Sequence, residues 1–192
     1  MPPKIKITRT EIINTALELV RKNGADALNA RAVAAALYCS TQPVFSNFSS
    51  MEELQNAVIS AAYEIYLGFL EREAESGRYP RYKSFGMAYI GFAQEEKELF
   101  KMLFMRDRKN EELSPSPDFE ASVELIMNAN GITRERAKLF HLEMWSCVHG
   151  IGTMLATSFM MLDRELISDM VSDIYHGLCL RAQFSGCRNE RM

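Results

Sequence analysis

A chain of 192 residues, 47% of them hydrophobic and 24% charged, has the length and composition of a folded protein with one or two domains. It contains no uninterrupted run of about 18 apolar residues, so we expect no membrane span. The first residues show no apolar signal core, which predicts a cytoplasmic protein. The four cysteines include no C-x-x-C pair, which predicts reduced thiols and not a disulfide framework.

The net charge of −3 is unevenly distributed along the chain. Residues 1–48 carry six Lys or Arg and three acidic residues, a net +3, whereas the remainder carries 16 basic and 22 acidic residues, a net −6. A basic end on an acidic body suits an anionic partner at one end only, although the asymmetry is modest.

Helical periodicity dominates the chain, and the first predicted helix covers 9–23. Its inward face consists of apolar residues: Ile12, Ile13, Ala16, Leu17 and Val20. Thr8 followed by Glu11 predicts a capping box, in which each side chain satisfies the free backbone N–H of the other. Gly24 is suited to end the helix in a left-handed conformation.

Two short helices joined by a three-residue turn follow, and this geometry predicts a helix-turn-helix over 29–48. The first of the two covers about 29–37, the turn covers 38–40, and the second covers 41–48. Pro43 falls in the first turn of the second helix, where its missing N–H costs nothing.

The outer face of this second short helix carries polar side chains suited to DNA. Gln and Asn can pair bidentately with adenine, and hydroxyls and backbone N–H groups at a helix start favour phosphate. We expect Val44 and Phe48 to pack inward. The predicted DNA-binding residues are Lys6, Arg9, Arg31, Ser40, Thr41, Gln42, Pro43, Ser46 and Asn47.

The rest of the chain is also predicted to be helical. A fourth helix starts near Met51 and breaks at 76–80. Five more helices are predicted, over 82–94, 96–108, 117–129, 133–162 and 164–184. The sequence therefore predicts an all-α fold, with an N-terminal three-helix helix-turn-helix head and a C-terminal helical bundle over 82–185.

An ordered set of short motifs lies in residues 6–66: Thr10-Glu11-Ile12-Ile13 with Ala16-Leu17, then Gly24, Asn29-Ala30-Arg31-Ala32-Val33-Ala34, Ser40, Val44-Phe45-Ser46-Asn47-Phe48 and Met51-Glu52-Glu53-Leu54. This set covers about a third of the chain and resembles the DNA-binding head of the TetR (tetracycline-repressor-like) family. The resemblance implies a homodimer bound to a palindromic double-stranded DNA operator, a ligand-binding helical body, and repression relieved by a small molecule.

The head departs from the family pattern at four positions. Tyr38 stands where the turn usually has Gly, and Phe45 stands where the short helix usually has Tyr. Asn47 replaces a frequent His, and Met51 replaces the usual Lys at the start of the fourth helix. Without that Tyr hydroxyl and Lys ammonium, phosphate contacts depend more on Thr41 and on the basic residues near the N-terminus.

Aromatic and methionine side chains are frequent from residue 82 onward. Methionine is flexible and suits a pocket for apolar ligands, although the same pattern also fits plain core packing.

Trp145-Ser146-Cys147-Val148-His149-Gly150 resembles a Trp-x-x-x-His-Gly motif in the body of one TetR subgroup. Trp145 and His149 lie one helical turn apart, and either line a pocket or belong to the core. The predicted ligand-pocket residues are Phe104, Met127, Trp145 and His149.

The last two predicted helices carry apolar residues at two-turn spacing, which predicts a homodimer interface built from both.

His176 and Cys179 have a permissible spacing for zinc, but no further ligand matches it locally, so no metal is predicted. No nucleophile–base set and no Gly-rich phosphate loop occurs, so we expect neither an enzyme nor a cofactor. The sequence predicts a repressor released by an apolar or amphipathic small molecule, and the alternative is a ligand- or protein-binding dimer without DNA recognition.

Overall fold

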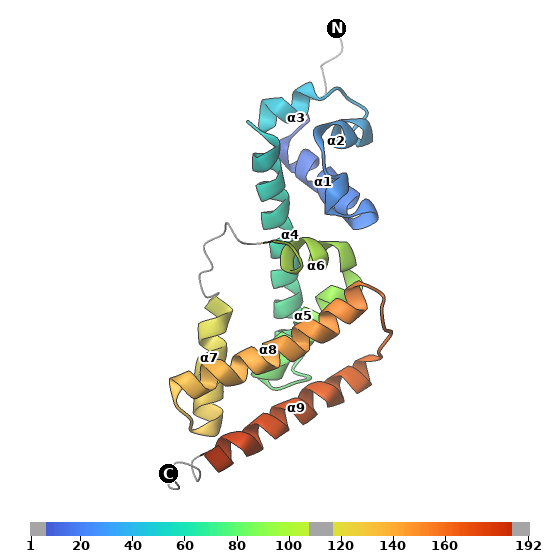
Figure 1. The fold of residues 1–192 in the computed structure, drawn as a ribbon. Helices are drawn as coiled ribbons and strands as arrows, with labels where there is room; N and C mark the ends of the chain where they lie inside the picture. Colours follow the sequence, from blue (N-terminus) through green and yellow to red (C-terminus); the bar gives the residue numbers. More distant parts are fainter. Residues whose placement is uncertain (1–6, 108–116, 186–192) are drawn as a thin grey trace. The chain divides into compact units, whose positions relative to one another are not determined.

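The computed structural model of this chain describes residues 7–107 and 117–185. Within these ranges the chain forms nine α-helices, one short 3-10 helix and no strand (Figure 1), which confirms the predicted all-α fold. None of the described helices has the length and apolarity that a membrane span needs. The elements are α1 (Arg9–Asn23), η1 (Ala25–Ala27), α2 (Ala30–Ala36), α3 (Gln42–Asn47), α4 (Met51–Glu75), α5 (Arg81–Glu95), α6 (Lys97–Phe104), α7 (Pro117–Asn130), α8 (Arg134–Ala156) and α9 (Arg164–Ser185).

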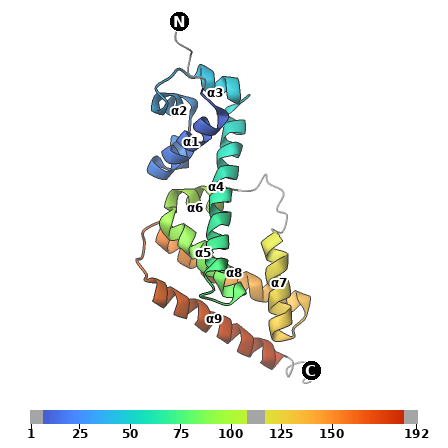
Figure 2. The same cartoon turned by 180° about the vertical axis from the view of Figure 1, so that it is seen from behind.

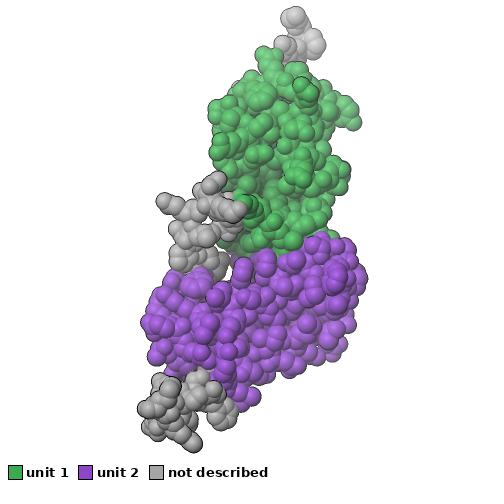
Figure 3. Space-filling view, in the orientation of Figure 1, with its two compact units in different colours: residues 1–68, 95–107 green, residues 69–94, 108–192 purple. Residues whose placement is uncertain are grey.

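The helices belong to two compact units, which Figure 3 colours separately. The first unit comprises the described residues up to 68 together with 95–107, so it contains α1 to α3, most of α4, and α6. The second unit comprises 69–94 and the described residues from 117 onward. The sequence prediction placed 82–185 in one body, whereas the contacts of the folded chain group α6 with the helix-turn-helix head.

Side chains at the helix starts explain where the first helices begin. The Thr8 hydroxyl accepts a hydrogen bond from the Glu11 N–H at 3.2 Å, and the Glu11 carboxylate accepts one from the Thr8 N–H at 2.7 Å, which confirms the capping box. Asn29 caps α2 through its side-chain oxygen. The second short helix begins one residue later than expected, at Gln42, so Thr41 precedes α3, and the Thr41 side chain makes no capping hydrogen bond.

An ion pair joins α6 to α1. The Arg21 guanidinium donates through Nε and Nη2 to the two carboxylate oxygens of Glu96, at 2.9 and 2.7 Å, and this hydrogen-bonded carboxylate raises the pKa of Arg21. Beside it, a Cβ added at Gly24 would stand 3.2 Å from Glu98 Oε2, so the α1 end and α6 approach closely. Leu99 and Phe100 of α6 are fully buried. These contacts are why α6 belongs to the first unit.

Two apolar side chains anchor α3. Val44 is fully buried, and Phe48, the residue that follows the helix, is 2% exposed. Both were predicted to pack inward, and the structure confirms this. Their burial leaves the opposite side of α3 facing outward, where Phe45 is 51% exposed.

An Arg9 cluster, made of Arg9, Asn47, Phe48, Ser49 and Glu53, ties the end of α3 to α1 and α4. The Arg9 guanidinium lies 4.0 Å from the centre of the Phe48 ring, and its Nη1 donates to the Asn47 carbonyl at 2.6 Å and to Glu53 Oε1 at 2.8 Å. Glu53 also accepts hydrogen bonds from the backbone N–H and the hydroxyl of Ser49, at 2.7 and 2.8 Å. The Ser49 hydrogen bonds and the Arg9 charge lower the pKa of Glu53 to about 2.

Two Tyr–His hydrogen bonds join α5 to α8 in the second unit. The Tyr82 hydroxyl lies 3.0 Å from His141 Nδ1, and the Tyr89 hydroxyl lies 2.8 Å from His149 Nδ1. Burial lowers the pKa of both histidines, which favours neutral rings. The helices α8 and α9 run side by side in both views (Figures 1 and 2) and are in contact.

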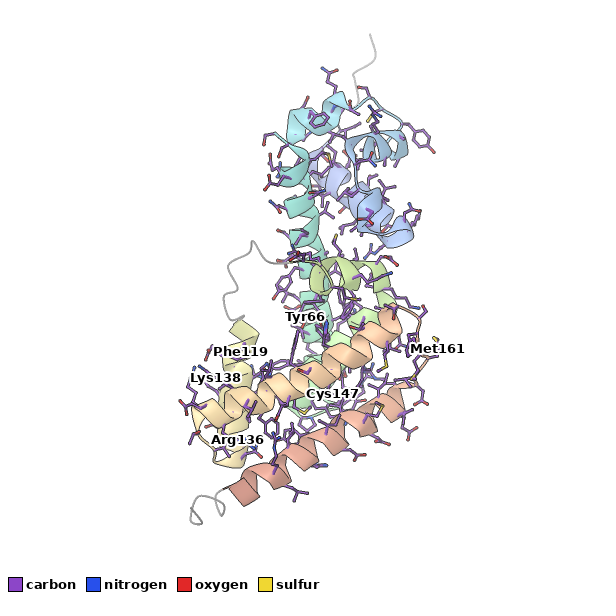
Figure 4. The ribbon with its side chains drawn as sticks, viewed as in Figure 1. Tyr66, Phe119, Arg136, Lys138, Cys147 and Met161 are labelled. Carbon is purple, nitrogen blue, oxygen red and sulfur yellow. The ribbon has the colours of Figure 1, made fainter. Side chains whose placement is uncertain are left out.

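The helix predicted over 133–162 is shorter in the structure. It ends at Ala156, and Ser158 takes a φ of 56°, a left-handed conformation that ends a helix. Phe159 and Met161 therefore lie in the connection to α9, both exposed, and the Met161 side chain is labelled there in Figure 4. The apolar side chains of this segment had extended the helical pattern in the sequence.

The two sides of α3 predict opposite responses to truncation. We expect Val44→Ala to lower the free energy of unfolding by about 1.5–3 kcal/mol, because it removes buried methyl groups and leaves a cavity. The neighbouring Phe45→Ala is the control and should cost at most about 1 kcal/mol. Chemical denaturation measures both, and an equal loss for the two variants would contradict this orientation of α3.

The Glu53 carboxylate predicts a loss of stability in acid. Its pKa is lower in the folded chain than the usual 4.5, so its contribution is complete above pH 4.5 and is lost as the pH falls through about 2. Glu53→Gln should remove this part of the pH dependence, whereas Glu52→Gln, at an exposed neighbouring position, should keep it. The free energy of unfolding, measured by denaturation between pH 2 and 6, tests this. If it falls with decreasing pH in Glu53→Gln as steeply as in the wild type, the prediction is contradicted.

Candidate nucleic-acid interface

The outward side of α3 offers few side chains, and they differ in chemistry. Gln42 and Ser46 are exposed polar residues, and the aromatic ring of Phe45 lies between them in the sequence. The Ser46 hydroxyl donates to the Gln42 carbonyl at 2.8 Å, so it remains able to accept a further hydrogen bond. Thr41 and Pro43 are half-buried. Of the predicted reading residues on α3, Gln42 has the most freedom to reach a base edge.

Asn47 has a different environment. Its side-chain amide donates to the Pro43 carbonyl at 2.8 Å and to the Ile7 carbonyl at 3.4 Å, and the residue is half-buried. Its own carbonyl accepts from Arg9. The side chain therefore links α3 to the segment before α1.

The remaining predicted DNA-binding residues, which are candidates for phosphate contact, also divide into two kinds. Arg31 is exposed on α2, and Ser40 is exposed in the turn that follows. Arg9 is engaged with Asn47, Phe48 and Glu53, so its guanidinium holds the end of α3 in place. Lys6 lies outside the described residues.

Tyr38 is an exposed residue of this head that is not among the predicted DNA-binding residues. Tyr38, in the turn between α2 and α3, is 98% exposed and has a φ of 53°. The sequence contained a signal for it, because a non-glycine residue occupies a turn position that usually needs Gly.

Two of the predicted ligand-pocket residues are brought together in the second unit. The rings of Trp145 and His149 stack with centres 4.8 Å apart and an interplanar angle of 9°. His149 also pairs with the Tyr89 hydroxyl of α5, so it connects a buried tyrosine to a tryptophan that is 44% exposed. Tyr89, His149 and Trp145 together form a polar and aromatic stripe that runs from the interior of the second unit to the surface of α8.

The other two predicted pocket residues lie elsewhere. Met127 is half-buried on α7. Phe104 is half-buried at the end of α6 in the first unit, where its ring meets the Tyr66 ring edge-on at 5.3 Å; Figure 4 labels Tyr66 on α4. Phe104 thus belongs to the aromatic packing of the head and α6.

Among the described residues, no three His, Cys, Asp or Glu side chains stand close enough together to hold a metal ion. The Cys179 thiol lies 3.0 Å from Asn130 Oδ1, and His176 is exposed on the same helix.

The sequence matches no protein-family model and no curated protein. Solved structures do match the fold. A protein of unknown function from Rhodococcus sp. RHA1 has a TM-score of 0.69 at 20% identity, over 95% of this chain and 99% of that one. A TetR-like transcriptional regulator from Rhodococcus sp. RHA1 has a TM-score of 0.64 at 15% identity, over 94% and 97% of the two chains.

A third solved structure, of a protein assigned to the TetR family of transcriptional regulators from Vibrio parahaemolyticus, has a TM-score of 0.59 at 15% identity, over 88% of this chain and 97% of that one. These matches extend over nearly the whole chain, although the shared identity is low. By its helical architecture, the chain has the fold of TetR-like transcriptional regulators.

Proposed function

We propose that this chain is a transcriptional regulator that binds a palindromic DNA operator as a homodimer and acts as a repressor released by a small apolar or amphipathic ligand. The observation that carries the proposal is the division of α3 into two sides. Val44 and the adjoining Phe48 are buried, while Gln42, Phe45 and Ser46 face outward. Such an anchored short helix with an outward polar face is what a recognition helix in the major groove requires.

The geometry supports three different roles among the predicted DNA-binding residues: base contact, phosphate contact and positioning of α3. Gln42 is the candidate for base contact, since a free glutamine side chain can pair bidentately with adenine. Exposed Arg31 and Ser40 are candidates for phosphate contact, which supplies affinity without sequence information. We assign Arg9 and Asn47 a positioning role, because both side chains already bind groups that fix the end of α3.

Exposed apolar side chains on the last two helices support the homodimer. They are Leu139 and Leu142 on α8 and Leu166 and Leu180 on α9. Exposed apolar side chains on two neighbouring helices are suited to a protein–protein contact, and two copies related by a two-fold axis would bury them in a four-helix arrangement. A symmetric dimer would also present two recognition helices to the half-sites of a palindrome.

The stripe of Tyr89, His149 and Trp145 supports an effector that contacts the second unit. A histidine that is hydrogen-bonded to a tyrosine hydroxyl and stacked on a tryptophan ring combines hydrogen-bonding capacity with apolar surface. Half-buried Met127 is a further candidate contact on α7. An amphipathic ligand matches this combination better than a highly charged one.

The first test concerns base reading by Gln42. A palindromic site is first selected from a random duplex pool. Gln42→Ala should then weaken binding to the selected site by about 5- to 150-fold, because one bidentate base contact is worth about 1–3 kcal/mol. Affinity for unrelated duplex should stay the same. Titration of labelled duplex at fixed salt measures both affinities.

Two variants control this experiment. Gln55→Ala removes an exposed glutamine on α4 and should leave both affinities unchanged. Asn47→Ala should lower the melting temperature and weaken binding to all duplexes alike. If the wild-type chain has no affinity for any duplex even at low salt, where phosphate contacts are strongest, a ligand- or protein-binding dimer without DNA recognition becomes the better assignment.

The second test concerns the dimer. The exposed fractions of Leu142 and Leu180 are 54% and 55%. The double variant Leu142→Glu with Leu180→Glu should sediment as a monomer at micromolar concentration with unchanged helix content, because buried unpaired carboxylates oppose association. Met105→Glu, at an exposed apolar position in the first unit, should remain dimeric. A double variant that still sediments as a dimer would place the interface elsewhere.

A further inference from the structure

We propose that Tyr38 contacts DNA directly, with its phenolic hydroxyl donating a hydrogen bond to a backbone phosphate oxygen beside the groove that α3 enters. This inference rests on the proposed function and adds a contact that does not depend on base sequence. Three independent features of the residue carry it: its backbone conformation, the exposure of its ring, and its place between the two short helices.

The backbone at Tyr38 is unfavourable for a tyrosine. Its φ of 53° lies in the left-handed region, where a Cβ crowds the neighbouring carbonyl oxygen. The residue ends α2 in the position that commonly belongs to Gly, since its N–H bonds to the Ala35 carbonyl at 3.1 Å and the Cys39 N–H bonds to the Ala34 carbonyl at 3.0 Å. Glycine would make the same turn without strain. The turn alone therefore gives no reason for a tyrosine.

The ring at Tyr38 adds nothing to the packing of the head. Its exposed fraction of 98% is the highest among the large apolar side chains that the structure leaves exposed. A side chain that buries almost no surface contributes almost no hydrophobic stabilisation to the fold. A strained backbone that carries an unpacked aromatic ring is typical of positions kept for contact with a partner.

The position of Tyr38 indicates which partner. It stands in the turn that leads into α3, close in sequence to exposed Ser40 and Gln42. In a helix-turn-helix the side chains of the recognition helix contact base edges, and the flanking segments meet the phosphates that border the groove. A tyrosine carries an O–H donor at the end of a long rigid ring, which suits a phosphate oxygen at that border.

The test uses Tyr38→Phe and Tyr38→Gly in the full-length chain, with duplex affinity and melting temperature as separate measurements. Tyr38→Phe should weaken binding about 10-fold, the effect of one hydrogen bond to a charged acceptor, with an unchanged melting temperature. Tyr38→Gly should weaken binding at least as much, while its melting temperature equals or exceeds that of the wild type by up to about 3 °C, because the left-handed strain is relieved. A gain in stability together with a loss of affinity is not expected of a merely structural residue.

The pattern across DNA sequences separates this contact from base reading. Both Tyr38 variants should lose affinity equally for the selected operator and for unrelated duplex, whereas Gln42→Ala loses it on the operator alone. The slope of affinity against salt should not change in Tyr38→Phe, because the hydroxyl carries no charge. Ser158→Gly is the matched control, since Ser158 is the other non-glycine residue with positive φ among the described residues and lies in the second unit. It should leave DNA binding unchanged.

The possible failures are distinguishable. If the wild type binds duplex and Gln42→Ala loses specificity, but Tyr38→Phe binds as tightly as the wild type, the Tyr38 contact is wrong and the proposed function stands. A loss confined to the operator would also overturn the phosphate assignment. If the wild type binds no duplex at all, both the function and the contact are overturned.

Discussion

A helix of 6 residues has too few internal hydrogen bonds to persist in water, so α3 exists only because the rest of the head holds it. Val44 and Phe48 supply the apolar anchor. Arg9 supplies the polar one, since one guanidinium meets the Phe48 ring, the last carbonyl of α3 and Glu53 at the same time. The orientation of every outward side chain on α3 depends on these contacts.

The same anchoring decides which polar residues remain available to a partner. Arg9 and Asn47 belong to residue types that bind DNA, yet Arg9 Nη1 and the Asn47 side-chain amide donate to acceptors within the protein. Gln42 carries no such restriction on its exposed face, and Tyr38 is exposed with a strained backbone. The chemistry of the interface thus follows from which side chains the fold uses internally and which it leaves outward.

The second unit uses a different set of interactions. Its α5 and α8 are joined by Tyr82–His141 and Tyr89–His149, where each hydroxyl meets a ring nitrogen of a histidine whose pKa is lowered by burial. Paired groups of this kind satisfy buried polar atoms without introducing charge. On the exposed side of α8, Leu139, Leu142 and Trp145 add apolar surface to these polar pairs.

Most of the helices could be predicted from local signals in the sequence, namely the apolar spacing, the Thr8 capping box and the Asn29 cap. The sequence also determined that Val44 and Phe48 face inward. Three features emerge only when the helices pack: α6 joins the head through Arg21 and Glu96, Asn47 and Arg9 hold α3 in place, and Tyr38 remains exposed. These outcomes depend on pairs of residues far apart in the chain, and no local pattern specifies which donor meets which acceptor once the helices pack.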